Sequence, residues 1–308
     1  MPDDRLDAQI PVTGRARLCE AGRMLTRGRD VPYLRHRPAE SAPPESARLE
    51  RDGYALLPGV LDAGEVAALA ADIQRVYDEW PADARRPHRA GEEAEQFRYE
   101  MLNRSAACQA VIGNRRILDV IEPLLGEDCH VIANTAWRNP ADTVHTHGGG
   151  LWHIDAGPHL PLPPGIDWDE RIPHPVFAVG CHILLQDCPP ACGPTAVIPR
   201  SHLSGEAPPP DRLDDPTLSW RGQEPVLLSA AAGDVQLFVS DVWHRRMPTG
   251  TGDAGRFFLQ VHYGRRDIAQ RLRPTAAANH LAPEAIERAV TDRDRTLIGL
   301  HRPLFYDG

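Results

Sequence analysis

The sequence predicts a mainly β fold with flanking α-helices, in which one domain has a β-barrel core and helices packed outside it. From about residue 129, short β-rich runs alternate with clusters of Gly, Pro and Asp, which is typical of an all-β sandwich or barrel. The 30 prolines among 308 residues are about twice the usual frequency and suit loop-rich connections better than a helix bundle. Helical periodicity is confined to short segments on either side of the β-rich region.

The N-terminal residues 1–47 show no clear periodicity, and we expect an extension there that is either partly disordered or folded as a flap over the active site. A single domain is expected over residues 48–308. Asp62 can cap a first helix, in which apolar residues recur at helical spacing up to Val76. Two more helices are expected at residues 114–125 and 283–290. The expected strands are residues 54–58, 130–136, 176–186, 195–198, 225–228, 235–239 and 257–263.

The charged residues exclude several classes of function. The chain has 34 basic and 43 acidic residues, a net charge of −9, and every basic residue is arginine. Without lysine there is no Schiff-base chemistry with pyridoxal phosphate, no Walker-A phosphate site and no lysine base. An acidic chain without a basic stripe is not expected to bind nucleic acid.

No apolar run reaches the ~18 residues that a membrane helix needs, and the acidic N-terminus does not look like a secretory signal. We therefore expect a cytoplasmic protein without membrane contact. Its six scattered cysteines are then expected to be reduced.

His153 and Asp155 are the first candidates for chemistry. Two residues apart on a strand, they point to the same face, and imidazole and carboxylate are both metal ligands. The tripeptide is common by chance and becomes informative only with a second histidine on a strand of the same barrel. His244 supplies it, between two expected strands. Two histidines and one carboxylate form the facial triad of non-haem Fe(II) oxygenases, which leaves three coordination positions for a bidentate co-substrate and O₂.

Arg256 lies twelve residues after His244 and begins an alternating strand. One face of that strand carries polar residues, so Arg256 is expected to point into the barrel and to bind a buried carboxylate of the co-substrate. Its planar guanidinium binds carboxylates bidentately and stays charged when desolvated. An ordinary surface ion pair is the alternative. The inward-facing set is Arg256, Phe258, Gln260 and His262.

These motifs together resemble the phytanoyl-CoA dioxygenase-like family of Fe(II)/2-oxoglutarate-dependent oxygenases. The resemblance runs from about residue 52 to residue 263. It includes the opening at residues 51–61, Trp-His-Ile-Asp at 152–155, the segment 193–202, and His244 followed by Arg256. The family often has Gly-Ser-His where this chain has Arg-Ser-His at 200–202.

The resemblance implies a double-stranded β-helix, with iron held by His153, Asp155 and His244 and 2-oxoglutarate held by Arg256. A second 2-oxoglutarate contact is expected on the strand before the His-x-Asp motif, where Asn134, Thr135 and Arg138 are all candidates. Asn134 and Thr195 are the further co-substrate contacts that we predict.

The predicted function is oxidation of an unactivated C–H bond with Fe(II), O₂ and 2-oxoglutarate, releasing succinate and CO₂. Hydroxylation, desaturation and oxidative cyclisation all remain open. Two alternatives also stay open: a cupin-type metalloenzyme using His145 and His147, and a barrel that binds a ligand without catalysis. A cupin site requires a glutamate a few residues after these histidines, and the chain has none there.

The substrate is expected to be a small polar metabolite, as in a biosynthetic pathway, rather than an acyl-CoA. The predicted mouth segments, residues 141–150 and 156–172, carry one arginine among several acidic residues, whereas CoA phosphates need clustered cations. The candidate substrate contacts are His145, His147, Trp152, His159 and Arg246.

Overall fold

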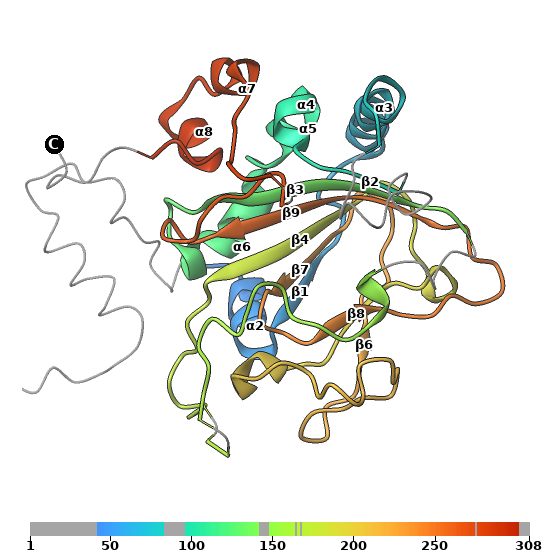
Figure 1. The fold of residues 1–308 in the computed structure, drawn as a ribbon, viewed down its shortest axis with the longest axis vertical. Helices are drawn as coiled ribbons and strands as arrows, with labels where there is room; N and C mark the ends of the chain where they lie inside the picture. Colours follow the sequence, from blue (N-terminus) through green and yellow to red (C-terminus); the bar gives the residue numbers. More distant parts are fainter. Residues whose placement is uncertain are drawn as a thin grey trace, which may run out of the picture.

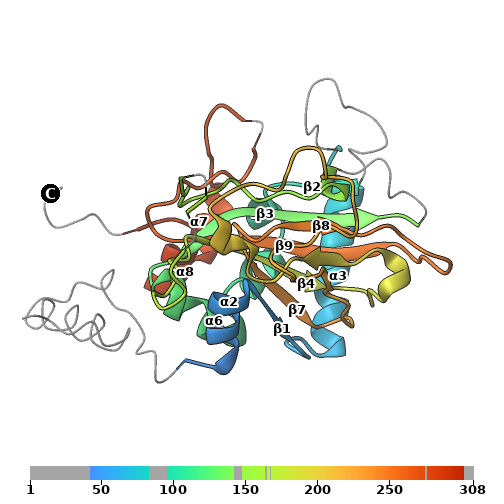
Figure 2. The same cartoon turned by 90° about the horizontal axis from the view of Figure 1, so that it is seen from below.

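Two β-sheets face each other in the computed structural model, and helices cover the outer face of the larger sheet (Figure 1). The structure describes residues 42–82, 96–141, 148–163, 165–166, 168–274 and 276–301. A view from below shows the smaller sheet lying along the other face of the larger one (Figure 2). This double-sheet arrangement confirms the predicted double-stranded β-helix. No helix in these ranges is both long and apolar enough to cross a membrane.

The larger sheet is antiparallel and has the order β1-β7-β4-β9-β3-β2. Its strands are β1 (Tyr54–Leu57), β2 (Phe97–Arg98), β3 (His130–Asn139), β4 (Ala178–Leu184), β7 (Val235–Val239) and β9 (Arg256–Gly264). The smaller sheet has the order β6-β5-β8, formed by β6 (Val226–Leu227), β5 (Thr195–Val197) and β8 (His244–Arg246). The helices are α2 (Pro44–Asp52), α3 (Ala63–Glu79), α4 (Met101–Arg104), α5 (Ala106–Val111), α6 (Arg115–Leu125), α7 (Pro283–Arg288) and α8 (Asp292–Leu297).

Helix α3 confirms the first predicted helix and begins with a capping box. The Asp62 carboxylate accepts from the Glu65 N–H at 2.9 Å, and the Glu65 carboxylate accepts from the Asp62 N–H at 2.8 Å. These bonds satisfy two N–H groups that the helix itself leaves free. The helices predicted at 114–125 and 283–290 are also present, as α6 and α7.

Helix α2 was not predicted and extends the packed region into the expected N-terminal extension. It begins at Pro44, four residues before the expected domain boundary at residue 48. The Ser46 hydroxyl donates to the Val120 carbonyl at 2.7 Å, and Leu49 is fully buried. The rest of the extension, and with it the flap hypothesis, lies outside the described residues.

Alternation along the strands separates two environments in the larger sheet. On β9, Leu259, Val261 and Tyr263 join the apolar core beneath the helices. The residues between them face the smaller sheet: Gln260 accepts from the Trp137 indole N–H at 2.7 Å, and His262 contacts Asp155 at 2.9 Å. The inward-facing set predicted for this strand is therefore confirmed.

The five cysteines in the described ranges are buried, free thiols. Burial raises the pKa of Cys108 to about 12. Burial also raises the pKa of Cys181 well above its ordinary value. Such thiols carry no negative charge near neutral pH, so these two cysteines act as small apolar residues of the core.

His202 couples the stability of the fold to pH. It follows β5 in the turn Ser201–Ser204, and its Nε2 lies 2.9 Å from the Glu50 carbonyl. A Cβ at Gly53 would lie 2.8 Å from the His202 Nδ1, and Gly53 has φ +84°, so this contact requires glycine. Burial, together with the neighbouring His174, lowers the pKa of His202 to about 4.

We expect the free energy of unfolding to fall as the pH drops from about 6.5 to about 4. In this window the unfolded chain protonates His202 and the folded chain does not, which costs about 3 kcal/mol of stability in total. Urea unfolding at pH 7 and pH 4.5 measures the loss. His202→Gln, which retains a donor for Glu50, should show a smaller loss between the two pH values. If the wild type and His202→Gln lost the same free energy of unfolding between the two pH values, His202 would not be the source of the loss.

Candidate active site

The backbone brings the three predicted metal ligands together from two distant segments. His153 and His244 form a reciprocal pair of backbone hydrogen bonds, each at 3.0 Å, so the 153–155 segment lies against β8. The Asp155 N–H donates to the Ser240 carbonyl at 2.9 Å and fixes the segment's other end. One ligand atom from each of His153, Asp155 and His244 lies within 4.8 Å of the other two.

Hydrogen bonds to backbone carbonyls orient both imidazoles of this triad. The Nδ1 of His153 lies 2.7 Å from the Leu151 carbonyl, and the Nδ1 of His244 lies 2.9 Å from the Val242 carbonyl. A carbonyl oxygen only accepts, so each Nδ1 carries a proton and each Nε2 is the atom left to bind a metal. The two Nε2 atoms lie 4.0 Å and 3.4 Å from the Asp155 carboxylate oxygens. This donor set fits a divalent iron ion.

The triad is open on one side. The side chain of His244 is 6% exposed, whereas those of His153 and Asp155 are 36% and 26% exposed. A ligand can therefore approach from the side of His153 and Asp155.

His262 supports the triad, a role that the sequence did not suggest. Its Nε2 lies 2.9 Å from the Asp155 Oδ2. Burial alone would raise the pKa of Asp155, but His244 and His262 hold it well below the ordinary value. The carboxylate is therefore anionic near neutral pH and is fixed in orientation, as a metal ligand requires.

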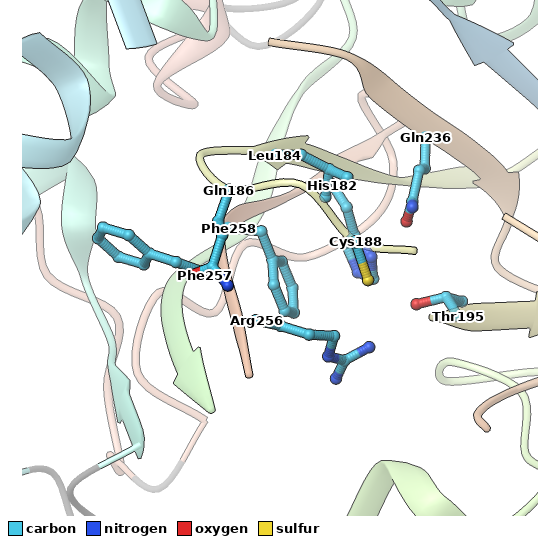
Figure 3. Close-up of a pocket in the computed structure, with 9 residues that line it drawn as sticks. All are labelled: His182, Leu184, Gln186, Cys188, Thr195, Gln236, Arg256, Phe257 and Phe258. Atoms are coloured by element: carbon cyan, nitrogen blue, oxygen red, sulfur yellow. The ribbon is translucent and has the colours of Figure 1, made fainter. Parts of the chain in front are cut away.

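Arg256 lies in a small pocket on the same inner face (Figure 3). It is 6% exposed, and its Nε and Nη2 donate to the Asn139 Oδ1 at 3.2 Å and 3.0 Å. Asn139 is itself held by the Gln96 side chain at 3.0 Å. These bonds use the Nε side of the guanidinium and leave its Nη1 end for a ligand. The pocket is lined by His182, Leu184, Gln186, Cys188, Thr195, Gln236, Arg256, Phe257 and Phe258.

The pocket fits a carboxylate rather than a cation. No carboxylate in the described part of the chain forms an ion pair with Arg256, so the guanidinium is left to bind an anionic ligand. Burial, with the positive charge of Arg256, lowers the pKa of His182 to about 3, so this imidazole is neutral. Thr195, which the sequence predicts as a co-substrate contact, is 5% exposed and places its hydroxyl in this pocket.

Asn134 does not face this pocket, which corrects the prediction of a co-substrate contact there. On β3, Thr135 and Asn139 pair with Gln260 and Arg256, which face inward. Successive residues of a strand face opposite sides, so Asn134 points toward the helices. Its side-chain amide donates to the Gln260 backbone carbonyl at 3.2 Å. Asn139, an odd number of residues away, is the inward-facing partner of Arg256.

The five candidate substrate contacts do not share one environment in the structure. His145 and His147 lie outside the described residues. Trp152 is 1% exposed and donates to the Asp215 carbonyl at 2.6 Å, because it points away from the interior that its neighbour His153 faces. Trp152 is therefore a packing residue, which corrects its prediction as a substrate contact.

The other two described candidates are His159 and Arg246. The His159 Nδ1 lies 2.7 Å from the Asp241 carboxylate. Arg246 lies on β8, two residues after His244.

Comparison with protein-family models identifies the family of this chain. The family described as phytanoyl-CoA dioxygenase (PhyH) matches residues 49–253, a range that contains all three triad residues. The chain belongs to the phytanoyl-CoA dioxygenase family. It is accordingly a non-haem Fe(II)/2-oxoglutarate-dependent enzyme, as the sequence predicted. No curated protein matches the chain.

Solved structures show the same fold at low identity. The non-heme α-ketoglutarate-dependent epimerase SnoN from nogalamycin biosynthesis is 22% identical with a TM-score of 0.55, covering 78% of this chain and 92% of its own. The carbocyclase SnoK from the same biosynthesis is 20% identical with a TM-score of 0.55, covering 76% and 88%. EctD from S. alaskensis, solved with 2-oxoglutarate and 5-hydroxyectoine, is 22% identical with a TM-score of 0.57, covering 79% and 83%.

Proposed function

We propose that this member of the phytanoyl-CoA dioxygenase family oxidises a small polar metabolite of a biosynthetic pathway, with His153, Asp155 and His244 as iron ligands and Arg256 as the anchor of 2-oxoglutarate. The observation that carries the proposal is that the triad lies on the same inner face as Arg256, a buried arginine for which the described residues provide no ion-pair partner. Bound iron would supply the oxidation of a C–H bond with O₂ and 2-oxoglutarate.

The side chains of the protein divide the remaining work. His153 and His244 each present Nε2 while a backbone carbonyl holds Nδ1–H, so neither ring needs to reorient. Arg256 binds the co-substrate carboxylate remote from the triad, which fixes the other end of the molecule beside the ligands. Phe238 and Phe258 pack against His182 at ring-centroid distances of 5.1 Å and 4.6 Å, and Phe258 gives the pocket an apolar wall.

Charge on the open side supports a substrate without phosphates. The predicted mouth segment at residues 156–172 contains one arginine, Arg171, which forms an ion pair with Asp169 at 2.5 Å. Glu170 forms a further ion pair with Arg200. The described part of this rim therefore offers no cluster of uncompensated cations to a CoA moiety. The similar structures SnoN, HygX from Streptomyces hygroscopicus and EctD were solved with nogalamycin RO, hygromycin B and 5-hydroxyectoine, respectively. None of these three compounds is a CoA thioester.

Succinate formation tests the proposed reaction. The Fe(II)-loaded protein should form succinate from 2-oxoglutarate faster when a pool of small metabolites contains the substrate. A matched panel of acyl-CoA thioesters should give no stimulation. Robust turnover on a CoA thioester, absent with the free acid, would refute the substrate class. Failure to form succinate with any pool, together with failure to bind 2-oxoglutarate, would refute the reaction.

His262 offers a test of the support of Asp155. His262→Leu removes the donor to the carboxylate and should weaken Fe(II) binding about 10- to 100-fold, as loss of such a supporting hydrogen bond does in other metal sites. His262→Gln retains an N–H donor and should bind iron more tightly than the leucine variant. Anaerobic Fe(II) titration measures both. Equal iron affinity in the wild type and both variants would leave His262 without this role.

A further inference from the structure

The guanidinium of Arg246 is buried and has no hydrogen-bond partner among the described residues. The residue is 3% exposed, and its Nε, Nη1 and Nη2 are all buried and unbonded. No ion pair reaches it from the described part of the chain. Buried donors without acceptors are costly, and the cost is greater when the group is charged. An anionic ligand would satisfy this guanidinium.

The strand register directs Arg246 toward the Arg256 pocket. On β8, His244 and Arg246 share one face, whereas Arg245 faces the other way and donates to the Asp214 carbonyl at 2.9 Å. Directly across the smaller sheet, Arg246 pairs with Thr195 of β5. Thr195 lines the Arg256 pocket, and Figure 3 shows the Arg256 guanidinium extending toward it. The two arginines therefore approach the pocket from opposite sheets.

Electrostatics agrees with this placement. Burial, and next the positive charge of Arg246, lower the pKa of Arg256 to about 9. The Cys188 thiol in the pocket does not offset these charges, because burial raises its pKa to about 11. The carboxylate of Asp253 acts in the opposite direction on the pKa of both arginines, but it does not outweigh burial. Two buried cations thus face a shared space, and no carboxylate of the described residues forms an ion pair with either.

We propose that Arg246 and Arg256 together bind the carboxylate of 2-oxoglutarate that lies remote from the triad, with the Thr195 hydroxyl as a further donor. This inference rests on the proposed function. A carboxylate has two oxygens and can accept from the free Nη1 end of Arg256 and from Arg246 at once. Arg246 is then a specificity-determining residue for the co-substrate rather than the substrate contact that the sequence suggested.

A pair of co-substrates separates this role from a structural one. Pyruvate shares the 2-oxo acid group of 2-oxoglutarate but has no second carboxylate. In anaerobic calorimetry with the Fe(II)-loaded protein, Arg246→Met should weaken 2-oxoglutarate binding about 10- to 100-fold and leave pyruvate binding unchanged. Arg246→Lys, which retains the charge, should lose less. Arg171→Gln, which removes an exposed arginine, is the matched control and should bind both acids as the wild type does.

The ligand-free protein provides an independent readout. Arg246→Met replaces an unpaired buried charge by an apolar side chain of similar length, so the thermal midpoint should rise by about 2–4 °C without ligand. Added 2-oxoglutarate should then stabilise the variant less than the wild type. A structural role predicts the opposite, a lower midpoint.

Three results would overturn the inference. Equal losses for pyruvate and 2-oxoglutarate would show a general disturbance of the site, and a lowered midpoint in the ligand-free variant would show a structural role. Unchanged 2-oxoglutarate binding with weakened substrate binding would place Arg246 at the substrate. A wild-type protein that binds neither oxo acid would instead refute the proposed function, and with it the occupant named here.

Discussion

Replacing His244 by alanine is expected to abolish tight iron binding and turnover while the fold persists. His244 contributes one of three ligand atoms that lie within 4.8 Å of one another, and it is the most buried of the three. Loss of a supporting hydrogen bond typically costs about 10- to 100-fold in metal affinity, so loss of a direct ligand should cost more than about 100-fold. Metal analysis and anaerobic Fe(II) titration measure the loss. His153→Ala and Asp155→Ala should behave alike.

Circular dichroism and an exposed histidine supply the controls for this experiment. His280 is exposed and distant from the triad in sequence, so His280→Ala should retain both iron and activity. The triad variants should retain the wild-type spectrum, because the strands that carry them are held by backbone hydrogen bonds. Full Fe(II) affinity in all three triad variants would show that the metal ligands are other residues.

Replacing Arg256 by glutamine is expected to raise the KM for 2-oxoglutarate by at least about 30-fold. Removing one partner of a buried charge-assisted contact costs about 2–5 kcal/mol. The KM for the substrate should change much less, because Arg256 lies in the co-substrate pocket with Thr195 and His182. Steady-state kinetics with each of the two varied in turn gives the comparison. Similar increases in both values would argue for a general loss of structure.

Two further variants make this prediction specific. Arg265→Gln removes an arginine just after β9 that pairs with Asp267 at 3.0 Å on the surface, and should leave 2-oxoglutarate dependence unchanged. Asn139→Leu removes the acceptor that orients Arg256 and should raise the KM for 2-oxoglutarate by less than Arg256→Gln does. Unchanged 2-oxoglutarate dependence in Arg256→Gln would move the anchor elsewhere in the protein.

Local patterns in the sequence were sufficient to predict the helices and strands whose formation depends on residues close together in the chain. The capping pair Asp62 and Glu65 and the apolar repeat of α3 act within a few residues, so the helix could be predicted directly. Alternation along β9 likewise identified its inward face. Strand β8 was missed because it has three residues, two of them arginines, and its pairing among the described residues is limited to β5 and the His153 segment. No local preference marks such a strand.

The sequence by itself determined the fold class, the family resemblance and the candidate ligands, because these depend on residue types at fixed spacing. Only the tertiary structure decided which inward-facing groups meet. Strand pairing placed Asn139 rather than Asn134 beside Arg256, and it set His262 against Asp155. It also left Arg246 buried without a partner opposite Thr195. The physical reason is register: a shift of one residue between strands would reverse every side chain, and register is fixed by contacts between segments far apart in the chain.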